Sequence, residues 1–271
     1  MAAFQIGKAS KPSVTKQNLK EIQKNLTQLR YSIHVIDSER IVDDIPLSMF
    51  DELLSISEEL GGYAAPVLTI PVRRSDFAER LKECIEVLKR HKLGGVCIVA
   101  GNPAYLNEDE KNRPADRLLI KAAEAVGKEA IYDGKLLMVG TENIERTAAY
   151  IAAKYRAIPF TLLDEARRGE VRRFSSAGRP VAVYVPYHIG NPLPEEALNR
   201  ARAYALRRLG NAGGEVEVAA KMCQVTVLGD VEKIRRRLMR IAEEGASLVV
   251  GYPLEEGLEQ VRRLAEAVLH M

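Results

Sequence analysis

Short apolar runs alternate with longer amphipathic segments along almost the whole chain. The runs are rich in β-branched residues, as in Gly95 to Ala100 and Pro180 to Tyr187, and their continuous apolar character is typical of strands buried on both faces. The segments between them carry apolar residues at helical spacing, for example Leu81, Ile85 and Leu88. This alternation predicts strands that are each followed by a helix, and therefore a parallel sheet.

The sequence contains eight such strand and helix pairs. The strands are expected to end near Gly7, Asp37, Pro71, Gly101, Gly140, Leu163, Tyr187 and Gly251. Eight pairs favour an α/β fold of the closed (β/α)8 TIM barrel type over an open doubly wound sheet, which commonly has about five or six strands. The segment Cys223 to Leu228 is either an extra strand or an extended lead into the following helix. We expect residues 1–271 to form a single domain, because one barrel uses about 250 residues.

A polar insertion separates the fourth predicted strand from its helix. It runs from Asn102 to Pro114 and contains two prolines and a charged run. A loop of this length is typical of a segment that covers one end of a barrel. We expect it at the same end as Asp37, because the loops that follow strands build the carboxyl-terminal face.

Composition supports a compact domain that stays inside the cell. Hydrophobic residues make up 46% and charged residues 28% of the chain, enough for a large core and a solvated exterior. The apolar runs are far shorter than the ~20 residues that span a bilayer, and Met1 to Lys11 lacks the apolar core of a signal peptide. We therefore expect a cytoplasmic protein with no membrane partner. The absence of tryptophan and the abundance of Arg and Glu would suit an archaeal or thermophilic source.

Several common kinds of site are excluded by their missing motifs. The chain has no Gly-x-Gly-x-x-Gly, no Gly-Lys-Ser/Thr loop and no His-Glu-x-x-His. Its three cysteines include no Cys-x-x-Cys pair, and its four histidines are too scattered to predict a metal cluster. We expect no metal site.

Charge gives no argument for nucleic acid as a partner. The formal net charge is only +3. One basic run, Lys233 to Arg240, shares a predicted helix with Ile234, Leu238 and Ile241, so its basic residues are expected to form the solvated face of that helix. Nucleic-acid binding therefore ranks last among the hypotheses.

Two of the predicted strands end in residues that suit a barrel mouth. Asp37 would leave the packed layers there and could orient a substrate or move a proton, although it could equally cap a helix or belong to a loop. Thr69 and Pro71 end the third strand, where they could face a flat ring or serve only as strand and turn residues.

The turns after the fourth, fifth and seventh strands offer further candidates. Gly101 and Asn102 form a tight turn that either lets backbone N–H groups approach a ligand or simply reverses the chain. Gly140 and Thr141 precede a predicted helix whose amino terminus could bind an anion, although Glu142 adds a negative charge there. Tyr187 and His188 end the seventh strand and either face a substrate or have only a structural role.

The chain closes with the stretch VTVLGDVEKIRRRLMRIAEEGASLVVGYPLEEGLEQVRRLAEAVL. This stretch resembles the closing pattern of the luciferase-like barrel enzymes, a family that includes the deazaflavin-dependent methylenetetrahydromethanopterin reductases. Its fifth strand and phosphate-side helix are similar to KLLMVGTENIERTAAYIAAKY, and its seventh strand and helix to RPVAVYVPYHIGNPLPEEALNRARAYAL. Its second strand, which usually ends in Asp-His, resembles VIDSER. Residues 65 to 103 also resemble the flavin-dependent methylenetetrahydrofolate reductases.

The resemblance implies a flavin (FMN or FAD) or a deazaflavin coenzyme in the barrel mouth. It implies hydride transfer to or from a small substrate, such as a C1-carrying pterin or folate. The catalytic candidate is then Asp37, and the cofactor-binding candidates are Thr69, Gly101, Asn102, Gly140 and Thr141. The substrate-binding candidates are Tyr187 and His188.

The chain also departs from that family's pattern, and the departures favour an alternative function. Ser38 stands where the family has His, Asn102 and Pro103 replace a Gly-rich turn, and Asp230 with Val231 replaces Thr-Pro. The alternative is a catalytically silent luciferase-like barrel that acts as a subunit or binding module. A homo-oligomer is compatible with both hypotheses.

Overall fold

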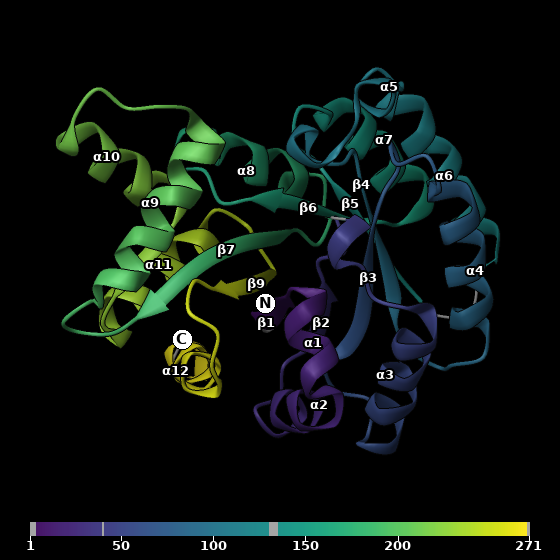
Figure 1. The fold of residues 1–271 in the computed structure, drawn as a ribbon, viewed down its shortest axis with the longest axis horizontal. Helices are drawn as coiled ribbons and strands as arrows, with labels where there is room; N and C mark the ends of the chain where they lie inside the picture. The colour runs from purple at the N-terminus through teal and green to yellow at the C-terminus, as the bar shows by residue number, and fades with distance from the viewer. Residues whose placement is uncertain (1–3, 40, 130–134, 270–271) are drawn as a thin grey trace. The chain divides into compact units, whose positions relative to one another are not determined.

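The fold is a parallel (β/α)8 barrel, as the alternation of strands and helices predicts. The computed structural model describes residues 4–39, 41–129 and 135–269 (Figure 1). Its sheet has the strand order β6-β5-β4-β3-β2-β1-β9-β7-β8, and β6 also pairs with β7. The strands are β1 (Gln5–Ser10), β2 (Ile33–Ile36), β3 (Ala65–Pro71), β4 (Gly95–Val99), β5 (Leu136–Gly140), β6 (Ile158–Leu162), β7 (Ala182–Ile189), β8 (Val227–Gly229) and β9 (Leu248–Pro253).

Helices follow the strands in the predicted order. The α-helices are α1 (Pro12–Gln17), α2 (Leu19–Gln28), α3 (Leu47–Glu59), α4 (Phe77–Lys89), α5 (Glu108–Lys111), α6 (Ala115–Glu129), α7 (Glu145–Tyr155), α8 (Arg168–Ser176), α9 (Glu195–Leu209), α10 (Glu215–Val225), α11 (Val231–Glu243) and α12 (Leu258–Leu269). Short 3-10 turns are η1 (Ile41–Asp43), η2 (Pro103–Tyr105) and η4 (Glu165–Arg167). The last helix was expected to reach His270, which lies outside the described residues.

The ambiguous segment before α11 contains both a helix end and a strand. Cys223 belongs to α10, whereas Val227–Gly229 forms the short strand β8, which pairs with the end of β7. The sequence segment therefore does contain an extra strand, which is only three residues long. It pairs with the last residues of β7, whereas β9 pairs with the preceding part of β7.

The chain divides into two compact units. Residues 9–160 form the amino-terminal unit, and residues 1–8 with 161–271 form the carboxyl-terminal unit. In the amino-terminal unit, α3 and α4 pack on β3, α6 packs on β4, and α7 packs on β5 (Figure 1). Strands β2 to β5 are almost entirely buried, which explains their continuous apolar sequences.

A buried polar network fixes the start of the amino-terminal unit. His34 of β2 lies 2.9 Å from the Ser10 hydroxyl through Nε2 and 3.3 Å from Gln23 Oε1 of α2 through Nδ1. Gln23 also donates a hydrogen bond of 2.6 Å to the carbonyl of Ala64. Because a buried polar group without a partner is costly, these bonds define one register for β1, β2 and α2. The backbone N–H of Asp37 then donates to the Ser10 carbonyl at 2.9 Å.

The inserted segment lies at the same end of the barrel as Asp37, as predicted. It contains η2 and α5, and Asn107 with Glu110 forms a capping box at the start of α5. Glu110 Oε1 accepts a hydrogen bond of 2.7 Å from the Ser75 N–H, in the turn that follows β3. Ser75 is of a residue type that often caps a helix, and its position predicts the cap of α4, but the helix begins at Phe77 with Asp76 as its N-cap residue.

In the carboxyl-terminal unit, one glutamine joins α12 to the end of β7. Gln260 Oε1 accepts from the Ile189 N–H at 2.8 Å, and its Nε2 donates to the Ile189 carbonyl at 3.1 Å. Tyr187 donates its hydroxyl to the Gln260 carbonyl at 3.1 Å. Tyr184 stacks on Tyr252 of β9 with ring centroids 5.6 Å apart. These contacts fix the relative positions of β7, β9 and α12 within this unit.

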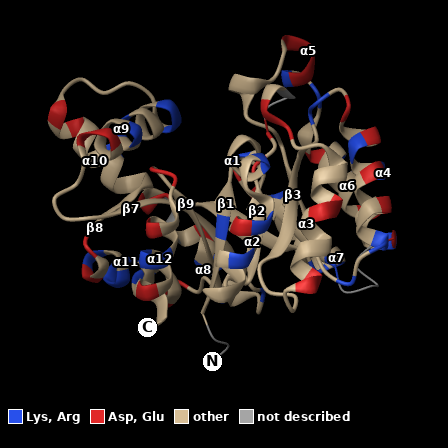
Figure 2. Cartoon of the chain, turned by 60° about the horizontal axis from the view of Figure 1, so that its bottom comes forward, with Lys and Arg blue, Asp and Glu red and all other residues tan. Residues whose placement is uncertain are grey.

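The basic run on α11 largely follows the prediction. Lys233, Arg236 and Arg240 are exposed, while the apolar face of the helix is buried. Figure 2 shows basic residues of α11 in blue beside acidic residues in red. Arg235 and Arg237 are the exceptions, because both are half-buried and ion-paired, Arg235 with Glu232 and Arg237 with Glu165. Arg237 also donates to the Cys223 carbonyl at 3.1 Å. Within the described part of the chain, no helix is both long and apolar enough to cross a membrane.

The packing of α12 against β9 depends on a missing side chain at Gly251. A Cβ atom there would overlap Leu264 Cδ2 of α12 and come within 2.8 Å of Tyr187 Cε1. We expect Gly251→Ala to lower the free energy of unfolding by about 1–3 kcal/mol, as overpacking does in other cores. Urea denaturation measures this. The matched control is Gly257→Ala, whose Cβ would meet nothing within 4 Å; equal stabilities for the two variants would contradict the packing shown.

Candidate functional site

The strand ends of the amino-terminal unit place a row of polar and sulfur-containing side chains side by side. His34 contacts α2, so alternation along β2 turns Asp37 to the opposite face of the sheet. Asp37 follows Ile36, which pairs with Leu68, so Asp37 is level with Thr69. Thr69 pairs with Cys97, which in turn pairs with Met138. The structure therefore brings the predicted residues Asp37 and Thr69 together at the carboxyl ends of neighbouring strands.

A second carboxyl group lies beside Asp37. It belongs to Glu39, two residues further along the chain, and both residues are half-buried. The backbone N–H of Glu39 donates to the Asp37 carboxyl, and the backbone N–H of Asn102 donates to the Glu39 carboxyl. We call Asp37 and Glu39 the carboxyl pair. Sequence reasoning missed Glu39, because it follows the strand in an irregular loop where no periodicity indicates its direction.

Burial and mutual repulsion give the two groups of the carboxyl pair different pKa values. Burial raises the pKa of Asp37 to about 6, against the opposing effects of Lys11 and of the Glu39 N–H, and the charge of Asp43 raises it further. Burial raises the pKa of Glu39 to about 8, and the charge of Asp37 adds to this. The Asn102 N–H opposes the rise, whereas Glu142 favours it. At neutral pH the pair therefore holds one proton, mainly on Glu39.

The thiol below the pair stays protonated. Cys97 is fully buried, and burial raises the pKa of its thiol well above the ordinary value, with the charges of Glu39 and Asp37 adding to the effect. The site therefore offers a proton donor and a carboxylate, but no thiolate nucleophile.

The two glycines expected to approach a ligand lie in close contact with neighbouring residues of the protein. Gly101 adopts a φ of +94°, and a Cβ there would lie 3.2 Å from Pro71 Cβ and 3.4 Å from Leu106 Cδ1. A Cβ at Gly140 would lie 3.1 Å from Val99 Cγ1 of the neighbouring strand. Both glycines therefore allow close packing within the protein, and their contact with a cofactor stays a prediction.

The polar groups expected to bind an anion already have partners in the protein. Asn102 donates its N–H to Glu39 and uses Oδ1 to accept the Ala104 N–H at 2.9 Å. The N–H of Thr141, a buried residue, donates to the Phe160 carbonyl at 3.2 Å. The following helix begins at Glu145 rather than at Thr141. The expected anion site at a helix start is therefore not formed by Gly140 and Thr141.

The two substrate-binding candidates lie in the carboxyl-terminal unit. Tyr187 is fully buried and donates its hydroxyl to the Gln260 carbonyl of α12, and its contact with a substrate stays a prediction. His188 is also buried, and its Nδ1 lies 3.5 Å from Glu255 Oε2. Burial lowers the pKa of His188, with Glu255 opposing and Arg263 adding to the effect. The imidazole is therefore neutral at pH 7, and a substrate contact for His188 stays a prediction.

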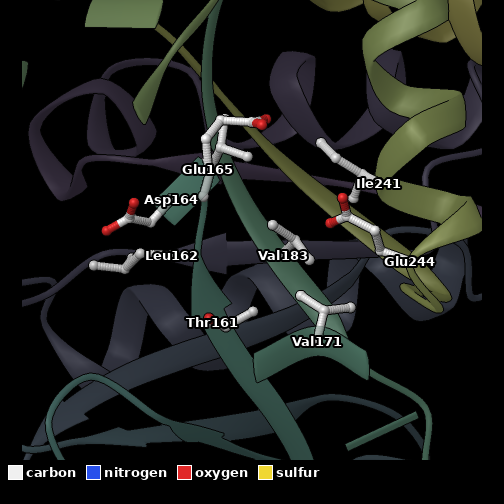
Figure 3. Close-up of a pocket in the computed structure, with 9 residues that line it drawn as sticks. Thr161, Leu162, Asp164, Glu165, Val171, Val183, Ile241 and Glu244 are labelled. Carbon is white, nitrogen blue, oxygen red and sulfur yellow. The ribbon is translucent and has the colours of Figure 1, made fainter. Parts of the chain in front are cut away.

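A hollow in the carboxyl-terminal unit is less suited to chemistry. It lies beside the end of β6 and is lined by acidic and apolar residues, among them Asp164, Glu165 and Glu244 (Figure 3). Asp164 accepts a hydrogen bond of 2.6 Å from Gln224, and Glu165 pairs with Arg237. Its acidic groups thus serve the packing of α10 and α11. Among the described residues, no group of three or more His, Cys, Asp or Glu could hold a metal ion.

Comparison with solved structures identifies proteins that share the fold, but it does not identify a reaction. The coenzyme F420 dependent tetrahydromethanopterin reductase from Methanopyrus kandleri has a TM-score of 0.68 at 10% identity, over 99% of both chains. An F420-dependent secondary alcohol dehydrogenase has a TM-score of 0.67 at 12% identity, over 98% of this chain and 99% of that one. A GH18 chitinase from Cycas revoluta reaches 0.59 at 10% identity, over 98% of both chains. Such low identities establish a shared fold alone.

Comparison of sequences identifies the family. The chain is 26% identical over 258 residues to an uncharacterized protein of Methanocaldococcus jannaschii, covering 94% of this chain and 96% of the relative. The family of unknown function DUF7388 matches residues 14–261, which is most of the chain. This chain therefore belongs to the family DUF7388.

Proposed function

We propose that the protein is an oxidoreductase of the flavin or deazaflavin kind, in which the carboxyl pair moves the proton that accompanies hydride transfer. The observation that carries the proposal is the pair itself, at the carboxyl end of β2. In barrel enzymes this end of the strands is where catalysis takes place. The likeness to two F420-dependent enzymes and the resemblance to luciferase-like barrels support the redox class. We infer a small substrate such as a C1-carrying pterin or folate.

The carboxyl pair is suited to proton transfer at neutral pH. A general acid must hold its proton until the reaction needs it, and a carboxyl with a pKa of about 8 does so. In the reverse direction the ionised Glu39 takes the proton back, and the negative charge of Asp37, which is ionised under the same conditions, helps to keep that proton on Glu39. When hydride adds to one atom of a polar double bond, the other atom gains negative charge, and Glu39 can neutralise it.

The residues near the pair fit the ring of a flavin-type coenzyme better than its phosphate. When bound, such a coenzyme supplies or accepts the hydride. Its uncharged ring needs a few hydrogen-bonding groups, and Asp37 and Thr69 at the strand ends, with Glu39 in the following loop, can provide them. Its phosphate needs unengaged N–H groups or cations. Gly140 and Thr141 do not offer them, so we do not assign the phosphate to these residues.

The alternative is a barrel without catalytic activity that serves as a subunit or binding module. The close packing at Gly101 and Gly140 favours it, because both positions can be explained by contacts within the protein. The presence of Ser38 in place of histidine favours it as well. The two functions differ in whether the chain binds a coenzyme at all.

Titration with F420 and with FMN, followed by the visible absorption and fluorescence of each, tests the proposed function. We expect one coenzyme to bind stoichiometrically, and its reduced form to be oxidised when a C1-carrying pterin or folate is added. Absence of binding by F420, FMN and FAD, in protein that is folded by circular dichroism, would leave the silent barrel as the function.

The rate of the coenzyme reaction should depend on pH in two directions. It should rise as Asp37 ionises near pH 6 and fall as Glu39 loses its proton near pH 8. Asp37→Asn and Glu39→Gln should each lower kcat by about 100-fold while changing coenzyme affinity little. The matched control is Glu83→Gln, at an exposed position on α4. A flat pH profile between 5 and 9 would contradict a role for the carboxyl pair.

Stability should report on Glu39 without any coenzyme. The pKa of Glu39 is about 8 in the folded protein, against an ordinary value of 4.5. The unfolded chain therefore loses this proton first, and the free energy of unfolding falls as pH rises from about 4.5 to 8. Glu39→Gln removes this loss, so its stability relative to the wild type should increase between pH 4.5 and 8.5, by up to about 5 kcal/mol for a difference of about 3.5 pKa units. Glu83→Gln, measured by urea denaturation at the same pH values, should show no such change.

A further inference from the structure

We propose that Arg74 is a positioning residue for the carboxyl pair, which it holds through the Ser38 peptide. Ser38 lies between Asp37 and Glu39 in the sequence, and Arg74 Nη1 donates a hydrogen bond of 3.3 Å to the Ser38 carbonyl. The inference rests on the proposed role of the pair in proton transfer. Arg74 acts on that role only by placing the backbone from which Glu39 projects.

Arg74 has the surroundings of a fixed structural cation. It is 3% exposed, in the turn that follows β3. Asp76 receives two of its hydrogen bonds, from Nε at 2.9 Å and from Nη2 at 2.6 Å, and Asp44 receives one from Nη2 at 3.0 Å. A planar guanidinium can serve these partners and the Ser38 carbonyl at once, which an ammonium group cannot do in the same geometry.

The contact with Ser38 matters more for Glu39 than for Asp37. Asp37 is held from the strand side, because its N–H donates to the Ser10 carbonyl at 2.9 Å. Glu39 lies beyond Ser38 and reaches the Asn102 N–H from there. A loop that shifts by about 1 Å can cost much of a catalytic effect. Loss of the Arg74 contact should therefore let Glu39 move toward water while Asp37 stays in place.

The position of Glu39 can be measured by its titration. The charged and polar groups that act on its carboxyl are Asp37, Glu142 and the Asn102 N–H, and those that act on Asp37 include Lys11 and Asp43. Burial is the largest cause of the raised pKa of Glu39. If Glu39 moves toward water, its pKa must fall toward the ordinary carboxyl value.

The experiment is a ¹³C NMR titration of the Glu39 carboxyl in the whole chain, with Arg74→Met compared with the wild type. The matched control is Arg80→Met, because Arg80 Nη2 binds the same Asp44 at 2.7 Å and also donates to the Ile45 carbonyl. No hydrogen bond between Arg80 and Ser38 is found among the described residues. The control thus removes the same charge from the same cluster while leaving the Ser38 contact in place.

We expect the titration midpoint of Glu39 to fall by at least about one pH unit in Arg74→Met and to stay at the wild-type value in Arg80→Met. In Arg74→Lys, which keeps the charge but loses the planar fork, we expect a smaller fall in the same direction. If Arg74→Met does not fold, the titration of Glu39 in Arg74→Lys tests the proposal in its place. An unchanged midpoint in the folded Arg74 variant, or an equal fall in Arg80→Met, overturns the proposal. Because the titration needs no coenzyme, failure of coenzyme binding would refute the proposed function alone.

Discussion

Two half-buried carboxyl groups lie next to each other beyond the end of β2. Holding them there costs free energy, and the surrounding loops provide hydrogen bonds that reduce this cost. Desolvation and repulsion disfavour two adjacent charges, so the pair retains a proton at neutral pH. Backbone N–H groups of Glu39 and Asn102 reduce that cost by donating to the carboxyls. The turn after β4 therefore has to lie against the turn after β2. A barrel satisfies this requirement because its parallel register brings the strand ends to one edge.

Hydrogen bonding within the protein also explains why backbone N–H groups at the expected ligand contacts already have partners. Buried N–H groups need partners, and in this chain the protein itself supplies them. Thr141 donates to Phe160, and Asn102 donates to Glu39. Glycine at 101 and 140 allows the close approach of Pro71 and Val99. A turn of small residues after a strand can allow either close packing within the protein or the approach of a ligand. The sequence pattern is the same in both cases.

The barrel could be predicted from sequence because its signal is periodic and repeated. Each strand is a continuous apolar run, and β1 to β7 with β9 lie close to the expected positions. Helix starts were less predictable, as Ser75 and Thr141 illustrate, because a cap depends on partners far away in the sequence. Ser75 donates its N–H to Glu110, which is 35 residues away. Asp37 could be placed at a strand end, but Glu39 and Arg74 lie in loops whose course depends on tertiary contacts.

The fold leaves the chemistry open, because reductases and a chitinase share it with this chain. The charges at the strand ends restrict which chemical groups can bind beside the carboxyl pair. Asp37, Asp43 and Glu142 place negative charge around a proton held on Glu39, and Lys11 is the cation that acts on Asp37. An anionic group would be repelled there, whereas an uncharged ring or carbonyl could accept the proton. The reacting part of any substrate or coenzyme at the carboxyl pair should therefore be uncharged, and any phosphate it carries must lie away from these carboxylates.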